Sequence, residues 1–133
     1  MLFMRPYREG DSFPEINPDP KNGLYFIALD GEKLIGFGRW KMTLDGIRIE
    51  EIEDGGDPEV FDGLLRGILN MAMEQGIDRA AFSGKIRPDR LATSMVPVDK
   101  ENGLKSISYF LENYKKCKMF LKRLCFISRR CII

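Results

Sequence analysis

The sequence contains no histidine in its 133 residues. Histidine is the commonest general base and the commonest metal ligand, so its absence excludes a Ser-His-Asp or Cys-His mechanism, and we expect no metal site. Acid–base chemistry would have to use carboxylates, tyrosine, lysine, cysteine or bound water. No apolar run approaches the roughly 20 residues that span a bilayer, and residues 1–6 lack a secretory pattern. We therefore expect a cytoplasmic protein with no transmembrane segment.

Acidic residues are missing from the end of the chain. Residues 115–133, the basic tail, hold seven Lys and Arg and no acid, whereas residues 1–114 hold 14 Lys and Arg against 20 Asp and Glu. The acidic body argues against a nucleic-acid partner. All three cysteines lie in the tail, and their odd number favours free thiols over disulfides. The tail has three open interpretations: a final strand able to mediate a homodimer, a partner-docking segment, or a membrane-surface anchor.

Apolar segments separated by turn residues predict a β-meander in one domain, residues 1–133. Residues 24–29 and 33–42 read as strands joined by the tight turn Asp30-Gly31, and a second Asp-Gly leads into a third strand at 47–53. A short strand at residues 2–7 precedes them, separated by a loop at 12–23. Glycines within and after the meander are expected to allow close packing, and the aromatic residues are expected to fill the core.

The third meander strand breaks its own alternation. Ile47 and Ile49 share one face, but Ile52 falls out of step, with two glutamates between them. One extra residue near Glu50–Glu51 would restore the pattern, which is the signature of a β-bulge. Fraying of an edge strand into the acidic loop explains the pattern equally well.

A crossover follows the meander and makes the domain α/β. Asp57-Pro58-Glu59 supplies a cap, a proline at the first helical position and an early acid, and apolar residues then recur at helical spacing until Gly76. Residues 78–83 read as the next strand, so some parallel pairing is expected. A long loop at 84–100 holds one short helical turn near 89–94. A second helix is predicted from Glu101 or Asn102 to about Lys116.

This order of elements resembles the GNAT superfamily of acyl-CoA-dependent N-acetyltransferases. Residues 4–11 (MRPYREGD) look like the first strand and turn of that family, residues 25–38 (YFIALDGEKLIGFG) like its central hairpin, and residues 64–72 (LLRGILNMA) like the helix after the coenzyme loop. The resemblance covers roughly residues 2–114. It implies a GNAT-like mixed, mainly antiparallel sheet with a crossover helix and a second, C-terminal helix.

The resemblance also implies a coenzyme site for acetyl-CoA. In that family a bulged strand diverges from its neighbour, the pantetheine arm enters the gap, and the pyrophosphate sits on backbone N–H groups before the helix. The corresponding coenzyme-binding residues here are Ile52, Glu53, Gly55 and Gly56, with Arg66 or Arg87 neutralising charge. The family loop signature, Arg or Gln, two residues, Gly, one residue, then Gly or Ala, is absent, and the loop is acidic instead.

The resemblance suggests three catalytic residues. Glu51, or a neighbouring glutamate, corresponds to the base that deprotonates an acceptor amine, and the other interpretation is a solvated strand edge. Tyr109 follows Asn102 at a family spacing for the tyrosine that protonates the leaving thiolate, although Lys105 replaces the family alanine, and Tyr114 is a second candidate. The other interpretation is that both rings pack the helix against the sheet. A reactive Cys117 beside lysines is a further hypothesis.

Two functions follow from these residues. The first is an acyl-CoA-dependent N-acyltransferase acting on a small-molecule amine or a protein, by direct attack on the thioester. The second is a non-catalytic module of the same fold that binds CoA, another small ligand or a protein partner. The segment 54–62 discriminates between them. Its backbone N–H groups must face a ligand for the coenzyme to bind, and its carboxylates would otherwise close the site.

Overall fold

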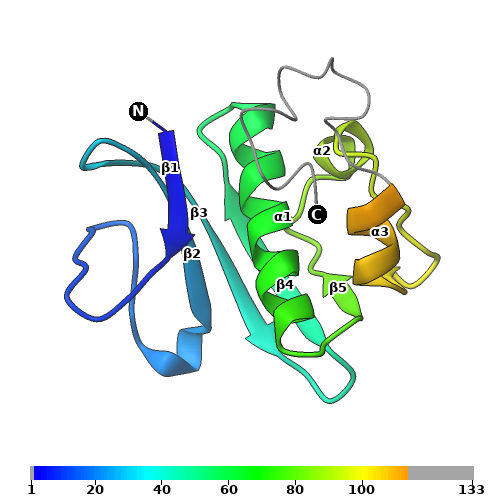
Figure 1. Cartoon of the computed structure of the whole chain (residues 1–133). Coiled ribbons are helices and arrows are strands. Elements are labelled where there is room, and N and C mark those ends of the chain that lie inside the picture. Colours follow the sequence, from blue (N-terminus) through cyan, green and yellow to red (C-terminus); the bar gives the residue numbers. More distant parts are fainter. Residues whose placement is uncertain (1, 114–133) are drawn as a thin grey trace.

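The computed structural model describes residues 2–113, which form one six-stranded sheet in the order β1-β2-β3-β4-β5-β6 (Figure 1). All neighbouring strands are antiparallel except β4 and β5, which are parallel. The expected mixed, mainly antiparallel sheet is therefore confirmed. The strands are β1 (Leu2–Pro6), β2 (Leu24–Asp30), β3 (Lys33–Met42), β4 (Ile47–Glu53), β5 (Ala80–Phe82) and β6 (Gly103–Leu104).

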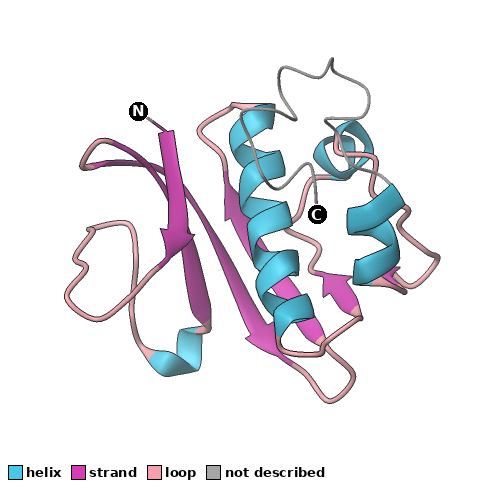
Figure 2. Ribbon diagram, viewed as in Figure 1, coloured by secondary structure: helices cyan, strands magenta, loops and turns pink. Residues whose placement is uncertain are grey.

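The helices of the described residues lie mainly on one face of this sheet (Figure 2). They are the 3-10 turn η1 (Pro20–Asn22), the crossover helix α1 (Pro58–Glu74), α2 (Pro88–Thr93) and α3 (Ile107–Asn113). α1 packs against β1 to β4, and both α2 and α3 contact α1. None of the helices described between residues 2 and 113 is long and apolar enough to cross a membrane.

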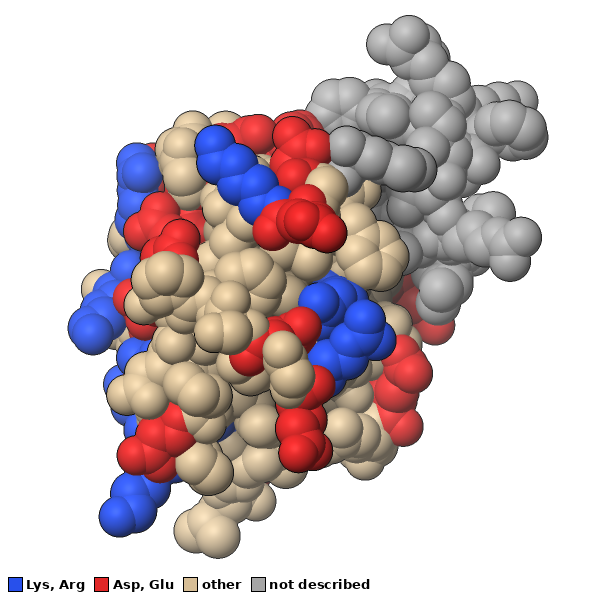
Figure 3. Space-filling view, turned by 90° about the vertical axis from the view of Figure 1, so that its left-hand side faces the viewer, with Lys and Arg blue, Asp and Glu red and all other residues tan. Residues whose placement is uncertain are grey.

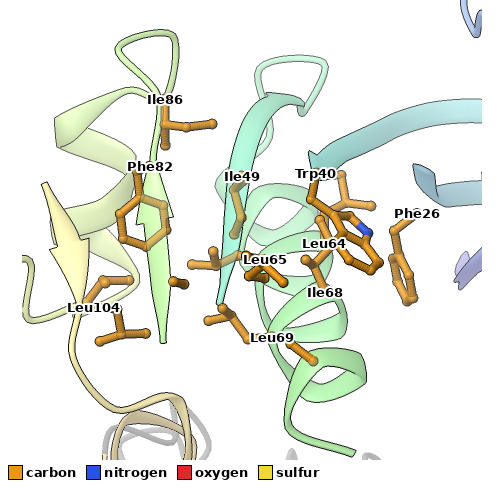
Figure 4. Close-up of a cluster of buried hydrophobic side chains, with 14 of the residues drawn as sticks. Phe26, Trp40, Ile49, Leu64, Leu65, Ile68, Leu69, Phe82, Ile86 and Leu104 are labelled. Carbon is orange, nitrogen blue, oxygen red and sulfur yellow. The ribbon is translucent and has the colours of Figure 1, made fainter. Parts of the chain in front are cut away.

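The start of α1 follows directly from its sequence. The Asp57 carboxylate accepts a hydrogen bond from the Glu59 N–H at 2.9 Å, and Pro58 occupies a position whose N–H would have had no helical partner. The apolar stripe of α1 is buried against the sheet (Figure 4). Burial of such side chains supplies most of the stability of a small domain, at roughly 25 cal/mol per Å² of apolar surface. The largest buried side chains in this layer include Trp40, Phe61, Leu64, Leu65, Ile68 and Phe110.

Glycines let α1 approach the sheet closely, as the sequence predicts. A Cβ built on Gly67 would lie 2.5 Å from the Phe26 ring, and one on Gly38 would lie 2.6 Å from the Ile68 Cδ1. A smaller apolar cluster covers the other face of β2 and β3, where Ile16 from the loop after β1 packs with strand side chains. The expected aromatic core is confirmed, since Phe26, Phe37, Trp40, Phe61, Phe82 and Phe110 are all buried.

The second predicted helix starts later than expected. Asn102 adopts a left-handed φ of 59°, and Gly103–Leu104 pair with β5 as β6, so α3 begins only at Ile107. The Asn102 side chain donates to the Phe82 carbonyl at 2.6 Å, while the Phe82 N–H donates to the Asn102 carbonyl at 2.9 Å. Asn tolerates the left-handed region, and these bonds hold it there. The predicted continuation to Lys116 lies outside the described residues.

Candidate functional site

A β-bulge interrupts β4, as the broken alternation predicts. Arg39 of β3 faces Glu51, but its neighbour Trp40 faces Ile49, so Glu50 is the extra residue on β4. Beyond the bulge the inward-facing side chain is Ile52, which packs on the α1 side of the sheet. The bulge thus lets the strand bend while keeping isoleucine in the core.

The parallel pairing of β4 and β5 ends at this bulge. The pairing runs from Ile47 opposite Ala80 to Ile49 opposite Phe82, and β5 ends there while β4 continues to Glu53. The Ser83 N–H donates to the Ile49 carbonyl at 3.0 Å as the last backbone bond between them. Residues 50–53 of β4 have no paired residue in β5, and we call the end of the ladder at this point the β4–β5 opening.

The loop between β4 and α1 has its backbone N–H groups engaged by the chain itself. The Gly55 N–H donates to the Glu53 carboxylate at 3.0 Å, and the Gly56 N–H donates to the Asp54 carboxylate at 2.8 Å. The Asp57 N–H donates to the Asp54 carbonyl at 3.0 Å, and Asp57 caps the helix. Carboxylates thus occupy donors that the resemblance assigns to a pyrophosphate.

Two arginines link the β4–α1 loop and α1 to the residues that follow β5. The Arg90 Nε donates to the second Asp54 carboxylate oxygen at 2.9 Å. Arg66 forms an ion pair with Asp62 at 3.0 Å, donates to the Ser94 carbonyl at 3.2 Å, and lies over the ring of Phe110, 4.7 Å from its centroid. In this arrangement the Arg66 guanidinium holds α1, α2 and α3 together.

The predicted base Glu51 lies on the sheet face opposite α1. Ile52 next to it packs on the α1 side, and side chains alternate along a strand. The Glu51 carboxylate accepts from Arg39 Nε at 3.3 Å, and the Arg39 guanidinium also donates to the Asn22 carbonyl at 2.7 Å. The Glu51 side chain is 38% exposed, so it remains accessible to an acceptor.

The predicted acid Tyr109 lies on α3, on the α1 side of the sheet. It is 57% exposed, and Ser106 caps its helix by accepting from the Tyr109 N–H at 3.2 Å. The structure thus places Glu51 and Tyr109 on opposite sides of the sheet. Asn102 lies before α3, so the two residues of this spacing do not share one helix. Tyr114, Cys117 and the basic tail lie outside the described residues.

Sequence reasoning did not identify the contacts that Ser83 makes with Glu50 and Arg90 with Asp54. Arg90 is 36 residues from its partner Asp54, so no local pattern could link them. Ser83 had a weak signal, because it is the polar residue at which an apolar strand ends. On the side of the molecule that carries the β1 edge, acidic and basic side chains are interspersed, with neither sign forming a continuous patch (Figure 3).

Comparison with known proteins identifies the fold. No model of a known protein family and no curated protein matches the sequence. The structure is similar to a GNAT family acetyltransferase from Elizabethkingia anophelis with acetyl-CoA bound, at a TM-score of 0.56 and 14% identity over 71% of this chain and 72% of that one. The strand order, the bulge and this likeness together show that the chain has the GNAT fold, as the resemblance implies.

Two further solved acetyltransferases share a lower similarity. One is the PaiA N-acetyltransferase from Thermoplasma acidophilum in complex with coenzyme A, at a TM-score of 0.47 and 16% identity over 61% of this chain and 59% of that one. The other is nourseothricin acetyltransferase, at a TM-score of 0.45 and 18% identity over 69% and 65% of the two chains. Likenesses at this level support no conclusion about function.

Proposed function

We propose that this protein binds an acyl-CoA thioester in the β4–β5 opening and transfers the acyl group to an amine. The observation that carries the proposal is the bulge at Glu50, placed where β4 and β5 separate. In a GNAT fold that separation admits the pantetheine arm, and the similar acetyltransferase from Elizabethkingia anophelis was solved with acetyl-CoA bound. The cosubstrate proposed here is acetyl-CoA, and the acceptor is a small-molecule or protein amine.

The proposed reaction is direct attack. The amine nitrogen forms a bond to the thioester carbonyl carbon, the carbon–sulfur bond breaks, and the coenzyme thiolate leaves and takes up a proton. An ammonium must first lose its proton to attack, and Glu51 is the proposed base. Tyr109 or Tyr114 remains the proposed proton donor to the leaving thiolate. Tyr109 would act from the α1 side of the sheet, across the β4–β5 opening from Glu51.

Calorimetric titration with acetyl-CoA and with free CoA tests the proposal. Micromolar binding is expected, followed by release of thiol when amines are supplied. Glu51→Gln should then lower kcat by roughly 10²- to 10⁴-fold while leaving coenzyme affinity unchanged. Glu101→Gln is the matched control and should keep full activity, because Glu101 lies just before β6 at the far edge of the sheet. Binding without turnover on any amine would overturn acyl transfer.

A second candidate is a module that binds a ligand or a protein without catalysis. The observation that favours it is the filling of the loop donors, since the N–H groups of Gly55 and Gly56 already bond to carboxylates. These carboxylates also repel a pyrophosphate. Absence of heat and of any thermal shift at millimolar acetyl-CoA would support this candidate and exclude the first.

A further inference from the structure

Ser83 clamps the bulge from the end of β5. Its N–H donates to the Ile49 carbonyl at 3.0 Å, and its hydroxyl donates a short hydrogen bond to the Glu50 carbonyl. In a regular strand the carbonyls of successive residues point to opposite edges, so one neighbouring residue cannot bond to both. The bulge turns the Glu50 carbonyl toward β5, where the Ser83 hydroxyl donates a hydrogen bond to it.

Every polar group of Ser83 is engaged in this arrangement. Its Oγ accepts from the Lys85 N–H at 3.2 Å, and its carbonyl accepts from the Ile86 N–H at 3.1 Å. These two bonds turn the chain away from β4 directly after the last bond of the parallel ladder. Ser83 is 5% exposed, so water competes little for its hydroxyl. The side chain thus replaces a backbone donor at the point where the two strands separate.

We propose that Ser83 is a positioning residue that fixes the peptide linking Glu50 to Glu51 and thereby sets the β4–β5 opening. Without the hydroxyl, the part-buried Glu50 carbonyl loses this partner, and leaving such a group unpaired is costly. The peptide would then turn toward water or β3. Either movement displaces the backbone that lines the opening and the start of the Glu51 side chain. The consequence for coenzyme binding rests on the proposed function, whereas the effect on the backbone does not.

Hydrogen exchange of the full chain, followed amide by amide, tests the backbone effect. Ser83→Ala should raise the exchange rates of residues 50–53 by about threefold to tenfold, the factor that corresponds to one net hydrogen bond. Ser94→Ala is the matched control, because Ser94 is also buried but lies after α2, away from β4. Ser83→Thr keeps the hydroxyl and should retain the wild-type rates.

Two results would overturn the proposal. One is equal exchange at residues 50–53 in Ser83→Ala and Ser94→Ala, and the other is loss of protection in Ser83→Thr to the level of Ser83→Ala. Acetyl-CoA titration adds a separate readout, in which Ser83→Ala should weaken binding by about threefold to tenfold and Ser94→Ala should not. If the wild type binds no acetyl-CoA, the proposed function fails, and the exchange rates still decide the role of Ser83.

Discussion

Arg90 and Asp54 form a largely buried ion pair that joins α2 to the loop before α1. The Arg90 Nε lies 2.9 Å from the Asp54 carboxylate, and the two side chains are 13% and 9% exposed. The other carboxylate oxygen accepts from the Gly56 N–H, so Asp54 bonds on both sides. This ion pair therefore links the long connection after β5 to the loop at which we propose that the coenzyme pyrophosphate binds.

Removing Arg90 should destabilise the protein markedly. Arg90→Leu leaves the Asp54 carboxylate buried without its cation, and breaking such a pair costs about 3 kcal/mol in the free energy of unfolding. Urea denaturation measures this loss. Arg87→Leu is the matched control, because Arg87 pairs with Asp89 on the surface, where both side chains are more than half exposed. An equal effect of the two substitutions would show that the Arg90–Asp54 pair adds no stability.

Gly36 should tolerate no side chain, because β3, β4 and α1 meet there. A Cβ on Gly36 would lie 2.7 Å from the Glu53 carbonyl oxygen and 2.8 Å from Val60 Cγ1. The backbone oxygen cannot rotate away, so Gly36→Ala should lower the free energy of unfolding by about 1–3 kcal/mol. Gly84→Ala is the control, since a Cβ there meets nothing within 4 Å. Equal unfolding midpoints in urea would contradict the close approach.

Stability should depend on pH below about 4 through Asp11. The Arg5 guanidinium donates two hydrogen bonds to this carboxylate, at 2.7 and 2.8 Å, and lowers the pKa of Asp11 from 3.8 to about 2. A pKa depressed by folding means that the stabilisation is present above the unfolded value and is lost as the pH falls toward 2. The difference in urea midpoint between the wild type and Asp11→Asn should therefore be largest near neutral pH and shrink below about pH 4. A difference that is independent of pH would contradict this.

The elements that position the candidate site were predictable where the signal is local. The cap and apolar spacing of α1 lie within one segment, and the bulge at Glu50 shows as an isoleucine out of step. β6 was missed because two residues are too few to leave a pattern. The later start of α3 depends on Asn102, whose left-handed conformation is held by bonds to Phe82 across the sheet.

The chemistry of the site was less predictable than its scaffold. The sequence shows that the loop after β4 is acidic, but not that Glu53 and Asp54 turn back onto the N–H groups of Gly55 and Gly56. Such turns compete with ligand binding and depend on side-chain conformation. Arg66, which we predict to neutralise coenzyme charge, pairs with Asp62 of its own helix.

The loop carboxylates should set coenzyme affinity. Glu53 is exposed and holds the Gly55 N–H, so Glu53→Ala frees one donor and removes one negative charge beside the proposed pyrophosphate position. Two charges about 4 Å apart interact by about 1 kcal/mol in water, so acetyl-CoA affinity should rise roughly fivefold. The gain should shrink at high salt, because exposed charges are screened. Glu101→Ala makes the same change in net charge at the far end of the sheet and should leave calorimetric affinity unchanged. An equal gain in both variants would show that net charge, and not the Gly55 donor, governs binding.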